Sequence, residues 1–161
     1  YYGDEIGMGD NLDLFDRNGV RTPMQWDDSL NAGFSTGKPF SELVKGEFGY
    51  QNVNVASQIN DPDSLFRSIK RMIAIRKKCA AFGGSSMEWV ETGSTSVAMY
   101  LRQNQEDTIL VFNNLSDSEE TVQIPEAYQR TYLNLFSGES QTLAAQVTLQ
   151  PYSYLWLEQV K

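Results

Sequence analysis

The sequence predicts an α+β protein in which loops and one amphipathic helix precede an all-β domain. Apolar residues recur at helical spacing between residues 65 and 80, and beyond residue 86 the apolar period becomes alternating. Glycine and serine are concentrated between these two regions, at residues 83–86. We therefore predict one domain over residues 1–85 and an antiparallel β-sandwich or Greek-key domain over residues 86–161.

The helix predicted around residues 65–80 is the element with the clearest sequence signals: a capping residue, a stripe of apolar residues along one face, and a glycine-rich end. Asn60 or Asp61 is expected to cap it, and Pro62 to occupy its first turn. Basic side chains cover much of the helix outside its apolar stripe, but the surrounding chain is acidic and lacks stacking aromatics, which argues against a nucleic-acid surface. The predicted apolar stripe consists of Leu65, Phe66, Ile69, Met72, Ile73 and Ala80.

The second domain is predicted to hold seven short strands separated by turn-rich links. Tyr152, Tyr154 and Trp156 near the last strand are open to two interpretations, a sugar-binding ladder or ordinary packing. The predicted strands cover residues 87–91, 97–103, 108–114, 119–124, 131–135, 146–149 and 153–158.

Composition excludes several classes of function. A net charge of −8 argues against general binding to nucleic acid or anionic membranes, and no apolar run is long enough to span a bilayer. One cysteine permits no intrachain disulfide, which fits a cytoplasmic location. The chain has no histidine, which removes Ser-His-Asp and Cys-His machinery. Acid–base chemistry must therefore rest on carboxylates, as in glycoside hydrolysis, and we expect no cofactor.

Residues 16–33 form a long polar loop with built-in turns. Pro23 restricts its own backbone and that of Thr22, so the loop is shaped. It carries a guanidinium at Arg21, an amide at Gln25 and an indole at Trp26. A flat ring beside fixed hydrogen-bonding groups suits a sugar. The structural alternatives are a salt bridge of Arg21 that pins the loop and packing of Trp26 onto the rest of the domain.

Three runs carry a resemblance to a known family: YGDEIGMGDN at residues 2–11, DRNGVRTPMQW at 16–26 and NAGFS at 31–35. They resemble the segment after the eighth barrel strand in the α-amylase family, glycoside hydrolase family 13. Residues 52–55 and 61–65 also fit, so the resemblance covers essentially the whole chain. Within the family it is strongest to the trehalose synthase group (maltose α-D-glucosyltransferases), followed by the oligo-1,6-glucosidase and α-glucosidase group.

The resemblance implies that residues 1–85 are the end of a (β/α)₈ barrel, its post-strand-8 loop and last helix. A complete barrel needs about 250 residues, so we expect a fragment or an excised piece whose partner is the missing N-terminal barrel portion. The resemblance places the catalytic carboxylates on strands four, five and seven, before Tyr1. It implies no catalytic residue in this chain and a glucose-pocket role for Arg21 on an α-linked glucose disaccharide or oligosaccharide.

Asp4 and Glu5 follow an expected strand end, where active-site groups of a barrel lie. We do not interpret them as the acid and nucleophile of a retaining glycosidase, because adjacent strand residues point to opposite faces while those carboxyl groups must lie about 5 Å apart across one substrate. The predicted substrate-binding residues are Arg21, Trp26, Gln25, Asp4 and Glu5.

A calcium loop is a weaker interpretation of residues 10–19. Aligned to an EF-hand on Gly19, the run places Leu14 at the first ligand and Gln25 where a bidentate Glu should stand. Turn-capping by Asp and Asn is favoured over an irregular metal site, so we expect no metal.

Three functions remain open. The chain is part of an enzyme that interconverts maltose and trehalose by a retaining route, part of an oligo-1,6-glucosidase or α-glucosidase, or a non-catalytic carbohydrate-binding or structural β domain. Residues 36–40, TGKPF, depart from the trehalose synthase pattern towards the hydrolases, and the first 85 residues argue against a β module alone. By itself the chain is expected to be inactive and to self-associate through its helix stripe, with disorder in the first 60 residues as the alternative.

Overall fold

The computed structural model describes residues 1–84 and 86–160 and divides into two compact units, Tyr1–Ile73 and Ala74–Lys161. The division lies inside a helix, α2, which spans Leu65–Lys78. Ser85 and Lys161, the last residues of the two predicted domains, lie outside the described residues. The predicted boundary between residues 85 and 86 stays a prediction.

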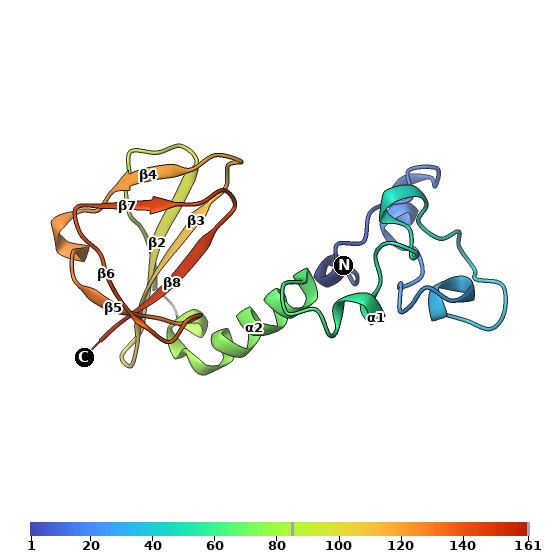
Figure 1. Ribbon diagram of the computed structural model, residues 1–161, viewed down its shortest axis with the longest axis horizontal. Coiled ribbons are helices and arrows are strands. Elements are labelled where there is room, and N and C mark those ends of the chain that lie inside the picture. The colour runs from blue at the N-terminus through green and yellow to red at the C-terminus, as the bar shows by residue number, and fades with distance from the viewer. Residues whose placement is uncertain (85, 161) are drawn as a thin grey trace. The chain divides into compact units, whose positions relative to one another are not determined.

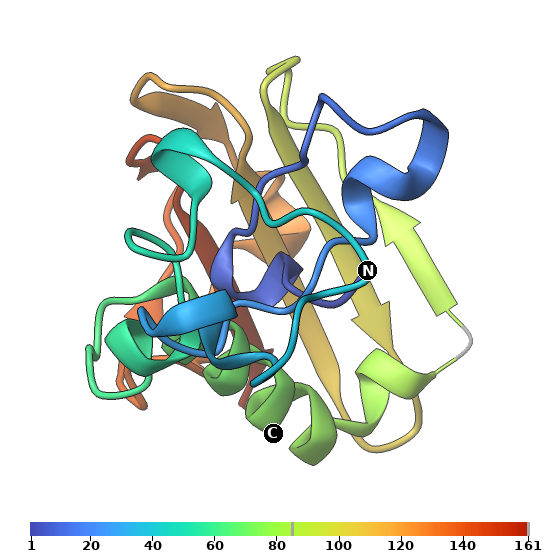
Figure 2. The same ribbon diagram turned by 90° about the vertical axis from the view of Figure 1, so that its right-hand side faces the viewer.

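The first unit consists mostly of loops joined by short helical turns (Figure 2). Its one α-helix besides α2 is α1, Val55–Gln58, where the Asn54 side chain accepts a hydrogen bond from the Ser57 amide at 2.8 Å. Four residues are too few to show a helical period, so the sequence did not predict α1. The 3₁₀ turns span Asp4–Ile6, Asp16–Val20, Leu30–Gly33 and Gly46–Phe48.

Helix α2 begins three residues later than its predicted first turn. The Ser64 hydroxyl accepts the Arg67 amide at 3.2 Å, and the Gln58 side-chain oxygen accepts the Phe66 amide at 3.1 Å. The predicted cap at Asn60 or Asp61 is therefore wrong. The Asp61 carboxylate instead accepts the Asp63 amide at 3.0 Å, a local turn that competes with the helix.

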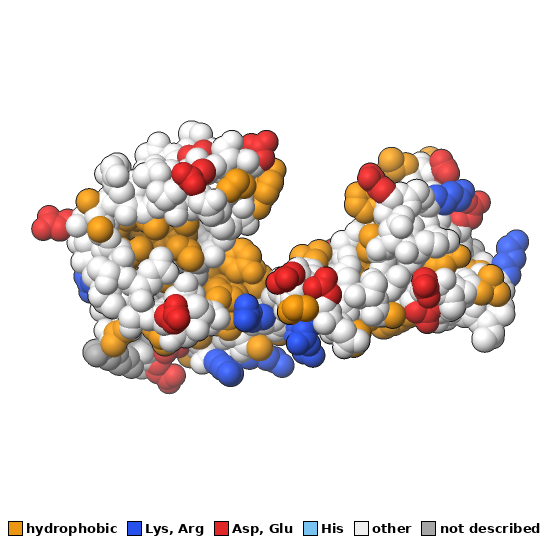
Figure 3. All heavy atoms as spheres, viewed as in Figure 1, with side chains coloured by type: hydrophobic (Ala, Val, Ile, Leu, Met, Phe, Trp, Pro, Cys, Tyr) orange, Lys and Arg blue, Asp and Glu red, His pale blue; other side chains and the backbone are white. Residues whose placement is uncertain are grey.

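The apolar stripe of α2 is only partly covered. All fourteen residues of α2 are described and none is buried. Leu65 is 45% and Ile73 50% exposed. Basic side chains gather over α2 in Figure 3. No described helix is both long and apolar enough to cross a membrane.

The second unit is antiparallel throughout its described strand pairs, as predicted. A six-stranded sheet has the order β1-β2-β3-β8-β5-β6, and β4 pairs with β7 (Figure 1). The seven predicted strands are confirmed to within two residues at each end. Strand β6 was missed because its three polar residues show no alternation. The strands are β1 Ser86–Trp89, β2 Val97–Gln103, β3 Thr108–Asn114, β4 Glu120–Gln123, β5 Thr131–Asn134, β6 Ser140–Thr142, β7 Gln146–Leu149 and β8 Tyr154–Gln159; a 3₁₀ turn at Ala80–Gly83 precedes β1, and another at Glu126–Tyr128 precedes β5.

Strand β3 is buried on both faces because each face of the large sheet is covered. Leu110 and Phe112 pack in the core that includes Val122 of β4 and Leu149 of β7. Ile109 and Val111, which alternate with them, pack on the opposite face in a second cluster. The other buried members of that cluster are Cys79, Ala81 and Phe82.

The aromatic series at the end of the chain packs within its own domain. The rings of Tyr154 and Trp156 lie 5.0 and 5.1 Å from that of Phe136, and Trp156 lies 4.5 Å from Phe82. Tyr152 precedes β8 and is exposed. These contacts favour packing over a sugar-binding ladder.

The Cys79 thiol should react only slowly with alkylating reagents until the second unit unfolds. Its side chain is buried, and this burial, reinforced by Glu158 and Asp107, raises the pKa of the thiol. A raised pKa lowers the thiolate fraction at a given pH, and the thiolate is the nucleophile. We expect iodoacetamide at pH 8 to label the native chain at least about tenfold more slowly than the urea-unfolded chain. Equal rates in the two states would show that Cys79 is accessible.

Candidate functional site

The segment from Arg21 to Trp26 is a buried run with exposed ends. Its four central residues, 22–25, are buried, whereas the side chains of Arg21 and Trp26 are exposed. The Tyr2 hydroxyl donates to the Thr22 carbonyl oxygen at 2.8 Å and helps to hold the run in place. The loop therefore presents a guanidinium and an indole from a fixed backbone.

Gln25 holds this run from inside the unit. Its side chain is fully buried, and its amide nitrogen donates to the carbonyl oxygens of Phe48, at 3.1 Å, and Val53. Its backbone oxygen accepts the Val55 amide at 3.0 Å. These contacts make Gln25 a positioning residue that joins the run to residues 46–55. Its side-chain oxygen is buried and has no hydrogen-bond partner among the described residues. The sugar contact expected of Gln25 stays a prediction.

Arg21 faces a hollow of about 580 Å³, within the size range of small-ligand sites. Among the described residues Arg21 is in none of the ion pairs. Its five N–H donors are thus not held by a carboxylate of residues 1–84 or 86–160, so the salt bridge considered for Arg21 is not formed there. The hollow is lined by Tyr1, Tyr2, Leu14, Asn18, Arg21, Phe40, Ser41 and Glu42.

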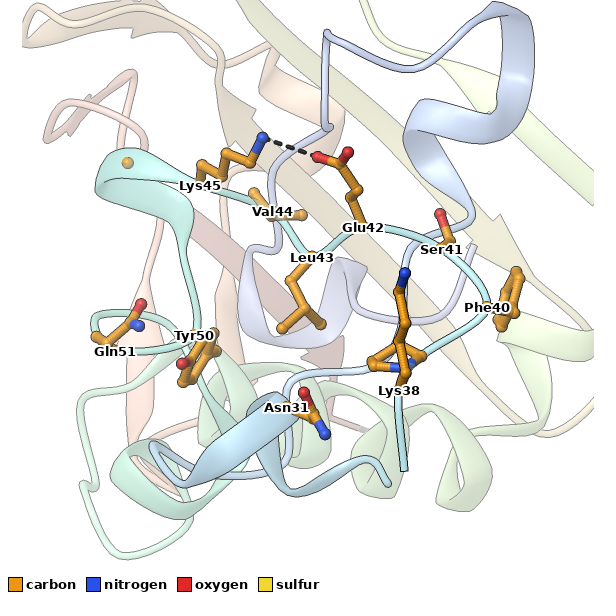
Figure 4. Close-up of a pocket in the computed structure, with 12 residues that line it drawn as sticks. Asn31, Lys38, Phe40, Ser41, Glu42, Leu43, Val44, Lys45, Tyr50 and Gln51 are labelled. Carbon is orange, nitrogen blue, oxygen red and sulfur yellow. Dashed lines mark hydrogen bonds and ion pairs between the residues drawn. The ribbon is translucent and has the colours of Figure 1, made fainter. Parts of the chain in front are cut away.

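A second hollow, of about 650 Å³, shares the wall Phe40–Ser41–Glu42 with the first. Leu43, Tyr50 and Asn31 border it in Figure 4. At its rim Lys45 Nζ lies 2.8 Å from Glu42 Oε2, an exposed ion pair. Apolar surfaces beside amide, hydroxyl and charged groups suit a sugar ring.

Asp4 and Glu5 lie in a 3₁₀ turn, Asp4–Ile6. The strand expected before them begins ahead of Tyr1, so their place behind a strand end stays a prediction. Gly3 and Gly7 flank this turn with φ values of 97° and 73°, a conformation that favours glycine. Asp4 lines a hollow of about 290 Å³ that shares Tyr1 and Tyr2 with the Arg21 hollow. The Glu5 carboxylate accepts the Gly3 amide at 2.9 Å. The structure does not bring Asp4 or Glu5 into the hollow that Arg21 lines.

The acidic run at residues 10–19 behaves as a set of turns and exposed ion pairs. Asn11 accepts the Asp13 amide at 3.1 Å and donates to the Leu43 carbonyl oxygen at 3.0 Å. Asp13 pairs with Lys45 at 3.5 Å, and Asp16 with Arg17 at 3.4 Å. Among the described residues, no three His, Cys, Asp or Glu side chains lie close enough together to hold a metal ion. Turn-capping accounts for the Asn11–Asp13 contact, and the others are exposed ion pairs and a hydrogen bond to the Leu43 backbone.

The matches to known families divide the chain between residues 83 and 87, where the spacing of apolar residues changes from helical to alternating. Residues 1–83, more than half of the chain, match the family model for the α-amylase catalytic domain. The chain belongs to the α-amylase family. Residues 87–156 match the C-terminal domain of maltogenic amylase. The predicted fold, the end of an α-amylase barrel followed by a β-rich C-terminal domain, is thereby confirmed.

Several α-amylase-family enzymes are similar over most of the chain. A trehalose synthase of Pimelobacter sp. is 42% identical over 132 residues, covering 77% of this chain and 23% of that protein. A trehalose synthase of Thermus thermophilus is 42% identical over 136 residues, 80% of this chain and 14% of that protein. An oligo-1,6-glucosidase of Bacillus cereus is 30% identical over 139 residues, 84% of this chain and 24% of that protein. The chain thus spans a quarter or less of the length of these relatives.

Solved structures of an enzyme with a similar fold support the assignment of this chain to the α-amylase family. The trehalulose synthase MutB of Pseudomonas mesoacidophila MX-45 superposes with a TM-score of 0.76 at 30% identity, covering 92% of this chain and 27% of MutB. A MutB mutant in complex with glucose gives a TM-score of 0.77 at 30% identity, with the same coverage.

Sequence reasoning missed the wall that the two hollows share. Phe40 is 81% exposed and lies some twenty residues after Arg21. The sequence signals for this segment were an aromatic directly after Pro39 and the departure of residues 36–40 from the trehalose synthase pattern.

Proposed function

We propose that this chain acts as part of a longer enzyme that interconverts maltose and trehalose by a retaining route. The observation that carries the proposal is the similarity to trehalose synthases, at 42% identity over 132 and 136 residues, against 36% over 102 and 30% over 139 residues for two oligo-1,6-glucosidases. In a retaining route one carboxylate attacks the anomeric carbon while a carboxylic acid protonates the leaving oxygen. The freed glucose then attacks the glycosyl-enzyme through a different hydroxyl, and the second carboxylate takes up the proton. Both carboxylates come from outside residues 1–161.

In this proposal the residues of the chain bind and orient the sugar. Arg21 donates charge-assisted hydrogen bonds to the hydroxyls of one glucose ring in the hollow that it lines. Trp26 lines neither hollow, and its exposed ring is offered to an apolar sugar face from the other end of the buried run. The neighbouring hollow beyond Phe40–Ser41–Glu42 receives the second ring. Two adjacent hollows with one shared wall match a disaccharide. Holding the freed glucose beside the glycosyl-enzyme favours its return over attack by water.

A hydrolase of α-1,6- or α-1,4-linked oligosaccharides is the second candidate. An oligo-1,6-glucosidase of Heyndrickxia coagulans is 36% identical over 102 residues, 63% of this chain and 18% of that protein. The TGKPF run at residues 36–40 differs from the trehalose synthase pattern and is closer to that of the hydrolases. It includes Phe40, which lines both hollows. The two candidates differ in how well the site excludes water from the intermediate.

Turnover of maltose by the whole enzyme separates these candidates. We expect NMR to show trehalose accumulating in excess of free glucose, with little turnover of isomaltose in a parallel sample. Glucose alone would overturn the isomerase proposal and support the hydrolase. The 161-residue chain by itself is the control and should convert neither sugar.

A further inference from the structure

The turn Asn31–Gly33 contains three successive residues in the left-handed backbone region. Their φ values are 58°, 59° and 64°. Glycine accepts this conformation at no steric cost and asparagine tolerates it, but Ala32 has a Cβ that disfavours it. Such conformations persist only where the surrounding structure holds them, and they cluster at functional sites.

The contacts around the turn account for its persistence. Ala32 is fully buried, and its amide donates to the Ser29 carbonyl oxygen at 3.0 Å. The Asn31 side-chain amide donates to the carbonyl oxygens of Ser35 and Gly37, both at 2.9 Å. The loop on both sides therefore holds the turn in the left-handed region.

The turn points the Ala32 carbonyl oxygen back at the backbone of Trp26 and Asp27. This oxygen accepts the Trp26 amide at 2.9 Å and the Asp27 amide at 3.3 Å. On the other side, the Trp26 carbonyl oxygen accepts the Ala56 amide at 2.9 Å. The backbone that carries the exposed indole is thus held from two directions, and one of them depends on the left-handed turn.

Gly33 is the position at which this arrangement is tightest. A Cβ there would lie 2.5 to 2.6 Å from the carboxylate atoms of Asp27. Moving the Asp27 carboxylate aside breaks the hydrogen bonds that it accepts from the amide, at 2.9 Å, and the hydroxyl of Ser29, and the φ of 64° at residue 33 strains any side chain placed there. A side chain at residue 33 must therefore displace either this carboxylate or the turn.

We propose that the Asn31–Gly33 turn is a positioning element that fixes Trp26 at the sugar site. The inference rests on the proposed function, since it assigns a sugar contact to Trp26. Ala32 and Gly33 set the place of the indole by sterics and backbone hydrogen bonds, and neither of them lines a hollow assigned to the sugar. A platform that is held in place before binding loses less freedom on binding, and it favours one orientation of the sugar.

Gly33→Ala in the whole enzyme tests the inference, with Gly37→Ala as the matched control. Gly37 lies in the same loop, but its φ is outside the left-handed region and a Cβ there would meet nothing closer than 3.9 Å. We expect Gly33→Ala to raise KM by about tenfold or more, and the amides of Trp26 and Asp27 to exchange with solvent at least about tenfold faster. Gly37→Ala should leave both quantities within about twofold of wild type.

The two readouts keep this inference separate from the proposed function. KM is measured on whichever α-glucoside the wild-type enzyme converts, and amide exchange requires no turnover. If Gly33→Ala does not fold, Asn31→Ala replaces it, because it removes the hydrogen bonds to Ser35 and Gly37 and a residue that tolerates the φ of 58°. Asn31 also lines the second hollow, so amide exchange is the deciding readout for this variant. Asn31→Ala should raise KM several-fold and accelerate exchange of the same amides. Wild-type KM and wild-type exchange in a folded variant would overturn the positioning role.

Discussion

Replacing Arg21 by lysine in the whole enzyme is expected to lower kcat/KM for its α-glucoside by about 10- to 100-fold. Arg21 lines the hollow between Tyr2 and Phe40 and forms no ion pair with any described residue, so its planar fork of donors is available to sugar hydroxyls. Lysine keeps the charge but loses the fork. A lost charge-assisted hydrogen bond costs about 1.5 to 3 kcal/mol, which is roughly the stated range.

Stability and a matched arginine provide the controls for this result. The Arg21 side chain is exposed, so Arg21→Lys should leave the melting temperature within about 2 °C of wild type. Arg17 lies in the same loop and pairs only with Asp16, at 3.4 Å and in solvent. Arg17→Lys should therefore leave kcat/KM within about twofold. Equal losses in both variants, or none in either, would remove Arg21 from the substrate site.

Phe112→Ala is expected to destabilise the second unit by about 3 to 5 kcal/mol, the largest stability effect that we predict. Phe112 lies on the central strand β3, is fully buried, and packs between the two sheets with Val122 and Leu149. Removing the ring loses its burial and leaves a cavity that the two sheets cannot close. Urea unfolding of the chain, followed by circular dichroism in the far ultraviolet, measures the effect.

Leu115→Ala provides the comparison for Phe112→Ala. Leu115 directly follows β3 and is 69% exposed, so its loss should change the free energy of unfolding by less than about 0.5 kcal/mol. A cost below about 1 kcal/mol for Phe112→Ala would contradict the packing described between the two sheets.

The β domain could be predicted well because its strands are half-buried and long enough to show their period. Met99 and Leu101 alternate with Tyr100 and Arg102 along β2, and the structure places the first pair in the core between the sheets. The start of α2 could not be predicted as well. Asp61 and Ser64 are both good caps, and only the folded chain shows that Ser64 takes that role.

The sequence predicted two exposed residues of the candidate site. It did not predict the contacts that hold the loop in place, because these join residues far apart in the chain. Arg21 and Trp26 stood out by their chemistry and by the family resemblance. The burial of Gln25 depends on the carbonyl oxygens of Phe48 and Val53, more than twenty residues away. The sequence did not predict the left-handed turn at residues 31–33. Asn31 and Gly33 often adopt this conformation, but Ala32 between them has a Cβ that disfavours it.

The most direct test of the sugar site is a crystal structure of the whole enzyme with glucose bound. We predict an Arg21 guanidinium nitrogen within about 3.2 Å of a glucose hydroxyl, and Trp26 ring atoms within about 4.5 Å of the same sugar. Phe40 should border that sugar and the neighbouring hollow, as it does here. Glucose bound with Arg21 and Trp26 both out of contact would contradict the assignment of this loop as the sugar-binding segment.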